Sequence, residues 1–136
     1  MAPWTFNEQP YLINSPELIG FVYLITNLTN DWRYIGKKLF TKASYKQINK
    51  KRKKIRKDSD WINYWGSNLQ LQEDVKRLGE ENFKREILHL CKSRGECNYY
   101  ETRAIFVSDA LLREKFYNAW VSCKITRNHL KTLQIF

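Results

Sequence analysis

The stretch GFVYLITNLTNDWRYIGKK, residues 20–38, decides how this chain folds. Its first half is almost entirely apolar or β-branched, which is typical of a strand covered on both faces. Turn-forming side chains at 27–31 separate this half from a second strand-like run that ends at Gly36. The stretch therefore predicts a β-hairpin with Tyr23 and Tyr34 on neighbouring strands. Because a phenol packs through its ring and exchanges a proton through its oxygen, the pair is a candidate for chemistry.

The segments after the hairpin predict two helices and a third strand. Apolar residues recur at helical spacing from Leu71 to Leu78, and Gly79 supplies a stop. Residues 83–90 predict the third strand, and a second helix is expected from Asn98. The apolar stripe expected on this second helix comprises Tyr100, Ala104, Val107 and Leu111. Together these elements predict an α+β domain with a small three-stranded antiparallel sheet flanked by helices.

Length and composition indicate one basic domain. The 136 residues suit a single domain of ordinary size, and 43% hydrophobic residues supply a core. Residues 1–19, interrupted by prolines, are expected to form an N-terminal arm. Residues 20–120 would form the domain, and residues 121–136 a C-terminal extension packed on it or trailing from it. The net charge of +10 favours polyanions as partners, nucleic acid first, and leaves a generic basic protein as the alternative.

The densest charge run, KQINKKRKKIRK at residues 46–57, has Lys or Arg at eight of its twelve positions. Such runs are usually solvated loops or helix ends, and the alternative is a segment that contacts phosphates. We favour phosphate contact, and expect poor order without a polyanion because the like charges repel one another. Trp61, Tyr64 and Trp65 either stack on bases or cap the core. The candidate nucleic-acid contacts are Lys37, Lys50, Lys51, Arg52, Lys53, Lys54, Arg56 and Tyr64.

The chain shows no targeting segment, no membrane span and no zinc motif. Its start lacks the basic patch and apolar run of a signal peptide, and no stretch approaches the ~20 apolar residues of a membrane helix. We therefore expect a cytoplasmic protein, in the host cytoplasm if a phage encodes it. Cys91, Cys97 and Cys123 are expected to be reduced thiols. His89 is expected to be a packed or rim residue of the third strand, and His129 lies in the tail, which disfavours a histidine-based nuclease or a zinc site that uses both.

Several short motifs occur in a fixed order along the chain. FVY at 21–23 and YIG at 34–36 open the series, and NYWGS, SNLQLQEDVKRLGEENFKREIL, NYYETRAIFV and FYNAW follow. This series resembles the GIY-YIG nuclease family, in particular its phage-type homing members, from about residue 20 to residue 120. The first triplet departs from the family pattern, because FVY stands where most members have GIY.

Glu101 is the carboxylate that the resemblance marks. From the residues alone it is either an exposed helix glutamate or a carboxylate near the core edge that is paired or binds a cation. In the family, a glutamate on the helix after the third strand binds the single divalent metal. The resemblance therefore implies Mg²⁺ or Mn²⁺ at Glu101, and such hard cations prefer oxygen ligands and keep most of their waters. Asn118 matches the asparagine that follows in the family.

The resemblance also implies roles for the two tyrosines. It assigns the general base to Tyr23, and leaves Tyr34 to position water or phosphate. A phenol can act as a base near neutral pH only if nearby cations or the metal lower its pKa. Most members carry an arginine on a helix shortly after YIG. Here Lys38 is the candidate cation near the site, with Arg52 and Arg56 as the next candidates.

These expectations combine into a metal-dependent endonuclease that hydrolyses phosphodiester bonds, most simply in double-stranded DNA. One site cuts one strand, so double-strand cleavage would need a homo-oligomer or two successive binding events. The first alternative is a catalytically inactive basic nucleic-acid-binding protein with the same fold. The second is an RNA-binding or interaction protein whose tyrosines only pack the core.

Overall fold

The main sheet of the computed structural model, which describes residues 2–121 and 124–133, has five strands. Their order is β2-β1-β7-β3-β4, with β3 paired antiparallel to both β4 and β7, and β1 parallel to β7. The strands are β1 (Trp4–Phe6), β2 (Gln9–Pro10), β3 (Gly20–Asn27), β4 (Arg33–Leu39) and β7 (Phe83–Cys91). The predicted hairpin is β3 and β4, and the predicted third strand is β7.

The prediction of a three-stranded sheet is wrong because the N-terminal residues add two strands. Trp4 to Phe6 pair with residues 85–87 of β7, so the contact joins segments about 80 residues apart in sequence. A parallel pairing over that separation leaves no local signal, and the prolines suggested an arm without regular structure. The arm instead completes one edge of the sheet and leaves β4 at the other edge.

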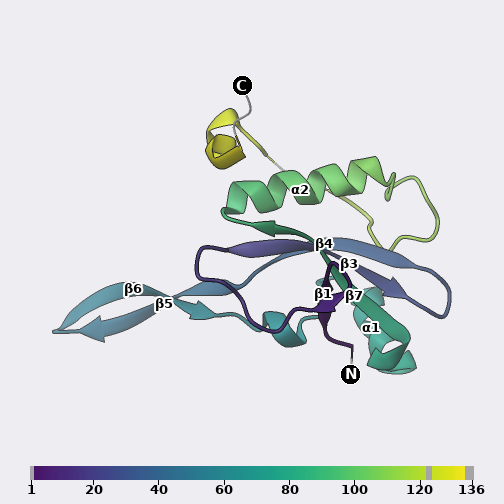
Figure 1. Ribbon diagram of the computed structural model, residues 1–136, viewed down its shortest axis with the longest axis horizontal. Coiled ribbons are helices and arrows are strands. Elements are labelled where there is room, and N and C mark those ends of the chain that lie inside the picture. The colour runs from purple at the N-terminus through teal and green to yellow at the C-terminus, as the bar shows by residue number, and fades with distance from the viewer. Residues whose placement is uncertain (1, 122–123, 134–136) are drawn as a thin grey trace.

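Two helices cover opposite faces of this sheet (Figure 1). Helix α1 (Leu69–Leu78) packs on one face and α2 (Arg94–Val107) on the other. Alternate residues of β3 point to each side: Phe21 and Tyr23 enter the core under α1, whereas Val22 enters the core under α2. The expectation of a strand covered on both faces is therefore confirmed.

The caps explain where the two helices begin. Asn68 accepts a hydrogen bond from the backbone N–H of Leu71, and Gly79 follows the last turn of α1, as the sequence predicts. Helix α2 begins at Arg94 rather than at Asn98, because Ser93 accepts from the N–H of Glu96 and caps an earlier turn.

The predicted apolar stripe on α2 is only half right. Tyr100 and Ala104 pack against the core, whereas Val107 is 76% exposed and Leu111 is 39% exposed. Cys97 and Ile105 take their place in the core. Three short 3₁₀ segments complete the fold: Trp61–Asn63, Glu80–Asn82 and Arg127–Leu133, the last packed against α2.

The basic run forms a two-stranded ribbon, and the expectation of a poorly ordered segment is wrong. Strands β5 (Thr41–Ile48) and β6 (Lys51–Asp58) pair over eight positions and extend away from the main sheet (Figure 1). Asn49 and Lys50 both have positive φ, 50° and 61°, as a two-residue turn of type I′ requires. The expectation rested on the charge of the run and did not use Asn49, which is typical of such a turn.

A chain of buried polar groups holds α1 to the segment after α2. The hydroxyl of Tyr117 donates to Asp74 Oδ2 at 2.7 Å and accepts from the side-chain amide of Asn27 at 3.1 Å. Burial raises the pKa of Asp74, but hydrogen bonds from Tyr117, Arg77 and Gln70 outweigh it, so the pKa lies below its ordinary value. Asp74 is therefore ionised in the folded protein at neutral pH.

Replacing Tyr117 with phenylalanine is expected to lower the free energy of unfolding by about 1–3 kcal/mol, because the change leaves Asp74 with an unpaired buried oxygen. Urea unfolding at pH 7 measures the difference. Since the pKa of Asp74 is lowered in the folded state, its contribution is present above the unfolded pKa of about 4 and is lost as pH falls further. Tyr99→Phe, at an exposed site, should stay within about 0.5 kcal/mol of the parent. Equal effects of the two variants would contradict the role of Tyr117.

Candidate active site

A cavity of about 550 Å³ lies along the free edge of β4. It is lined by Tyr34 and Lys37 from β4, Glu101 from α2, and Ser67 just before α1. The segment around Asn118 closes one side. The cavity therefore collects side chains from both faces of the sheet at its β4 edge, beyond the isolated bridge between Arg33 and Phe116.

Strand alternation explains how these groups meet. Along β4, Tyr34 points to the face that α1 covers, whereas Lys37 points to the face that α2 covers. The Tyr34 hydroxyl lies 3.0 Å from Ser67 Oγ, and Lys37 Nζ lies 3.9 Å from Glu101 Oε1. The edge strand thus presents a phenol and an ammonium group to the same opening.

Glu101 is a largely buried carboxylate, and its neighbours offset only part of the cost of burying its charge. Its side chain is 18% exposed, and Lys37 is its one ion-pair partner among the described residues. Burial raises the pKa of Glu101, and the charge of Lys37 opposes that rise only in part. A carboxylate in this state gains from a nearby cation.

The donor set fits a divalent metal ion with few protein ligands. Glu101 opens into a cavity with room for water, next to the neutral oxygens of Tyr34 and Ser67. Within residues 2–121 and 124–133 no group of three or more Asp, Glu, His or Cys side chains is placed to hold a metal. Mg²⁺ and Mn²⁺ suit such a site, because a hard cation can keep most of its waters while it binds one carboxylate.

The two tyrosines occupy different environments. Tyr34 is partly buried and lines the cavity, whereas Tyr23 is 1% exposed and belongs to the core. Their ring centroids are 6.1 Å apart. A Cβ atom at Gly36 would overlap the Tyr23 hydroxyl, so the glycine of YIG leaves the space that this phenol fills. The Tyr23 hydroxyl therefore lies beneath β4 instead of in the cavity.

The protein's own charges do not lower the pKa of either phenol, contrary to the expectation from sequence. Burial raises the pKa of Tyr23 well above 10, and the neighbouring Tyr64, Tyr34 and Glu101 add to the rise. Burial likewise raises the pKa of Tyr34, although the hydrogen bond to Ser67 opposes it. The cause is that the buried apolar rings around each phenol disfavour a charge.

Asn118 uses its whole side-chain amide to hold the edge strand. Its Oδ1 accepts from the N–H of Ile35 at 2.9 Å, and its Nδ2 donates to the C=O of Ile35 at 2.8 Å. At Ile35 the amide thus makes the two hydrogen bonds that a neighbouring strand would make. We read Asn118 as a positioning residue, in place of the catalytic role that its match to the family asparagine implies.

Lys37, not Lys38, is the cation beside Glu101. Lys38 points to the opposite face of β4, where its Nζ lies 2.6 Å from Asp60 Oδ1 and 4.1 Å from the ring centre of Tyr64. The prediction of Lys38 did not take account of the alternation of side chains along the strand. That alternation was the available signal for Lys37.

The remaining candidates lie outside the cavity. Arg56 donates to the backbone and side chain of Thr41, and Arg52 stacks on the ring of Tyr45, so both belong to the ribbon and are not near Glu101. Trp61 is buried, and Tyr64 and Trp65 pack against the core, which favours the capping interpretation. The other ribbon candidates, all exposed, are Lys50, Lys51, Lys53 and Lys54.

The cysteines and His89 take no part in the cavity. Cys91 and Cys97 are free and buried in the core under α2, while Cys123 lies outside the described residues. His89 stacks on Tyr100 with ring centres 3.7 Å apart, and burial lowers its pKa. The packed role expected for His89 is confirmed.

Comparison with known proteins identifies the family. A family model described as "Putative endonuclease segE, GIY-YIG domain" matches residues 4–121, so the chain belongs to the GIY-YIG endonuclease family. Within it, the chain is similar to "Putative endonuclease segE" of Enterobacteria phage T4, with 33% identity over 100 residues. The match covers 72% of this chain and 39% of that relative's length. No solved structure matches.

The family resemblance inferred from the motifs is therefore confirmed. The described part of the chain contains no helix long and apolar enough to cross a lipid bilayer.

Proposed function

We propose that this chain is a metal-dependent endonuclease that hydrolyses phosphodiester bonds in double-stranded DNA. One observation carries the proposal: Glu101 and Tyr34 line the same open cavity, with Lys37 beside them, at the free edge of the sheet. The basic ribbon of β5 and β6, which starts two residues after β4 ends, supplies an extended positive surface. Neutralising DNA phosphates with such a surface releases counterions and favours binding without regard to sequence.

Each group in the cavity has a role in this proposal. Mg²⁺ or Mn²⁺ held at Glu101 would neutralise charge on the phosphorane and assist the departing oxygen. Lys37 faces the same opening and is suited to contact a phosphate oxygen. Of the two tyrosines only Tyr34 lines the cavity, so we assign the proton acceptor to Tyr34. Tyr23 then supports β4 from below, in place of the base role that the family resemblance gives it.

An inactive DNA-binding protein with the same fold is the second candidate. The raised pKa values of both phenols and the FVY triplet favour it. Incubating supercoiled plasmid with the purified chain and Mg²⁺ separates the two candidates. We expect nicked circles to appear before linear product, since one cavity cuts one strand, and EDTA to prevent both. Intact plasmid in Mg²⁺ and in Mn²⁺, with DNA binding retained, would favour the inactive protein.

Tyr34→Phe is expected to lower the nicking rate about 10²–10⁴-fold, the usual contribution of a positioned acid or base. Tyr23→Phe should keep most of the rate, because its hydroxyl does not open into the cavity. The rate of the parent chain should rise about tenfold per pH unit from pH 7 to 9, since the pKa of Tyr34 lies above 10 and the phenolate fraction grows with pH.

Initial nicking rates over this pH range check the assignment, with thermal unfolding as the control for fold. Tyr34→Phe should flatten the pH profile as well as lower it. Loss of nicking in Tyr23→Phe with a normal Tyr34→Phe would reverse the roles of the two tyrosines.

A further inference from the structure

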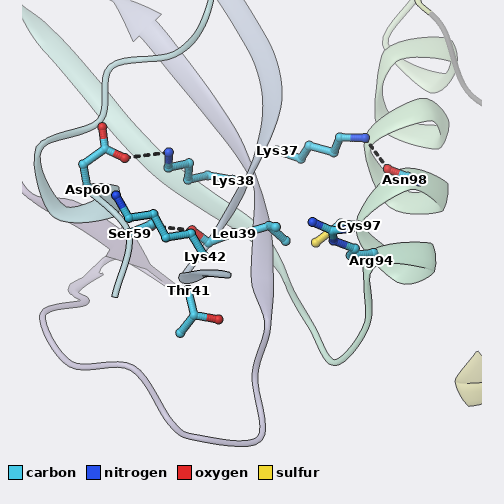
Figure 2. Close-up of a pocket in the computed structure, with 10 residues that line it drawn as sticks. All are labelled: Lys37, Lys38, Leu39, Thr41, Lys42, Ser59, Asp60, Arg94, Cys97 and Asn98. Atoms are coloured by element: carbon cyan, nitrogen blue, oxygen red, sulfur yellow. Dashed lines mark hydrogen bonds and ion pairs between the residues drawn. The ribbon is translucent and has the colours of Figure 1, made fainter. Parts of the chain in front are cut away.

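A second cavity, of about 490 Å³, shares Lys37 with the first, and Figure 2 shows the residues that line it. It is enclosed by the end of β4, the start of β5, the residues just after β6 and the first turns of α2. Its charged lining residues are Lys37, Lys38, Lys42, Arg94 and Asp60. Four cations and one carboxylate therefore line the cavity, from four separate parts of the chain, and Lys37 is also paired with Glu101 of the first cavity and with Asn98.

Two of the four cations, Lys37 and Lys38, are paired with carboxylates, and Lys42 and Arg94 are the other two. Asp60 is paired with Lys38 at 2.6 Å, and this hydrogen bond is the main reason that the pKa of Asp60 is lowered. Within the ranges that the structure describes, neither Lys42 nor Arg94 has a carboxylate oxygen within 4.0 Å. Lys42 also faces Lys57 directly across the ribbon, and like charges in such a pair repel. The cavity is therefore electropositive and suited to an anion.

The arrangement of the side chains suits a phosphate group. Figure 2 shows Lys37 and Lys38 leaving β4 in opposite directions, with Arg94 across the cavity on α2. A guanidinium binds a phosphate through two parallel hydrogen bonds, and ammonium groups add charge without fixed geometry. Leu39 provides an apolar side of the cavity on which sugar atoms can pack.

The position of the cavity indicates that the phosphate belongs to a DNA strand. Lys37 lines both cavities, so the second adjoins the one that contains Glu101. Thr41 and Lys42 belong to the start of the ribbon, so the second cavity also adjoins the basic hairpin. A DNA strand that passes from the first cavity to the ribbon would place a phosphate here.

We propose that this second cavity binds a backbone phosphate of the DNA strand that flanks the phosphate to be cut. The proposal rests on the proposed function, because it takes the first cavity as the place of cleavage. Arg94 and Lys42 are the residues that hold the flanking phosphate, and they set the register of the strand relative to Glu101. Phosphate contacts of this kind position the protein on DNA without reading sequence.

The test compares two double variants in a Glu101→Gln background, which keeps the DNA intact. Lys42→Gln/Arg94→Gln removes two charges from the cavity, and Arg113→Gln/Lys131→Gln removes two exposed charges that line neither cavity. Fluorescence anisotropy with a labelled 20-base-pair duplex gives Kd at several salt concentrations. Because Lys42 and Arg94 are exposed, both variants should keep the parent's melting temperature.

We expect the cavity variant to bind about tenfold more weakly than the control variant at 100 mM salt. The slope of log Kd against log salt should fall by about 0.9, the value for one lost phosphate contact on duplex DNA. Equal affinities and slopes for the two variants would overturn the inference. A parent chain that binds DNA without cutting it would contradict the proposed function and leave this binding result unaffected.

Discussion

Replacing Glu101 with glutamine is expected to lower the rate of plasmid nicking at least about a thousandfold. A bound metal ion is worth several kcal/mol of transition-state stabilisation, and each ~1.4 kcal/mol corresponds to a factor of ten in rate. Glutamine keeps the shape of the side chain and removes the charge that would hold the metal. The loss should therefore appear in kcat, with affinity for DNA changed little. Initial rates of nicking in saturating Mg²⁺ measure it.

The same substitution, Glu101→Gln, should not lower the stability of the folded protein, although it lowers the nicking rate. Burial raises the pKa of Glu101 in the folded protein, so its contribution to stability is present below the unfolded pKa and is lost as pH rises through the folded value. At pH 7 the buried Glu101 carboxyl thus costs stability, and Glu101→Gln should melt at the same temperature as the parent or higher. Mg²⁺ should raise the melting temperature of the parent and not of the variant, since a ligand that binds only the folded state stabilises it.

Glu114→Gln provides the matched control, because it removes one exposed acid after α2 that does not line the cavity. This variant should nick plasmid at the parent's rate and keep the response of melting temperature to Mg²⁺. Parent-like nicking by Glu101→Gln would remove the carboxylate from the mechanism. An equal Mg²⁺ shift in both variants would place the metal elsewhere.

Local patterns in the sequence were enough to find the central elements. The β3–β4 hairpin was predicted from an apolar run followed by turn-forming residues, and α1 from its helical spacing and the stop at Gly79. The pairing of β1 with β7 was missed because it joins segments that are distant in sequence. Strand β1 has only three residues, which are too few to show a periodicity. The ribbon was missed for a different reason, because the dense charges concealed an ordinary Asn-containing turn between Ile48 and Lys51.

The residues of the candidate site were likewise predicted only in part. The family motifs led to Glu101 and Tyr34, and the structure brings both to one cavity. Lys37 was passed over for Lys38, although strand alternation distinguishes them. The burial of Tyr23 follows from its place in the middle of a strand that is apolar on both faces. The sequence did not predict that α2 packs beside the edge of β4, because that contact depends on the packing of the whole sheet.

Replacing Arg85 with methionine is expected to lower the free energy of unfolding by about 4 kcal/mol. Arg85 lies on β7, is 2% exposed, and is stacked between Trp4 and Trp65 with its guanidinium carbon 4.6 Å and 4.2 Å from the two ring centres. Its guanidinium donates to the backbone carbonyls of Ala2, Ile62 and Tyr64 at 2.8–3.0 Å. Methionine fills the space and leaves those carbonyls without donors, at a cost of about 1–3 kcal/mol for each unsatisfied buried group.

Urea unfolding measures this loss, with Arg113→Met as an exposed control expected to stay within about 0.5 kcal/mol of the parent. Domains of this size are stable by about 5–15 kcal/mol, so 4 kcal/mol would be a large fraction of the total. A parent-like midpoint for Arg85→Met would show that the hydrogen bonds to the three carbonyls add nothing to stability.

The same residue links stability to the active site. Burial lowers the pKa of Arg85 to about 10, and the group still carries its charge at neutral pH, because three carbonyls and two indole rings replace its water. Two of those carbonyls belong to the segment that leads into Gly66 and Ser67, and Ser67 in turn holds the Tyr34 hydroxyl. Loosening this segment should therefore disturb Tyr34 before the sheet itself opens. We expect Arg85→Met to lose nicking activity at urea concentrations at which its β-sheet circular dichroism signal is still that of the folded state.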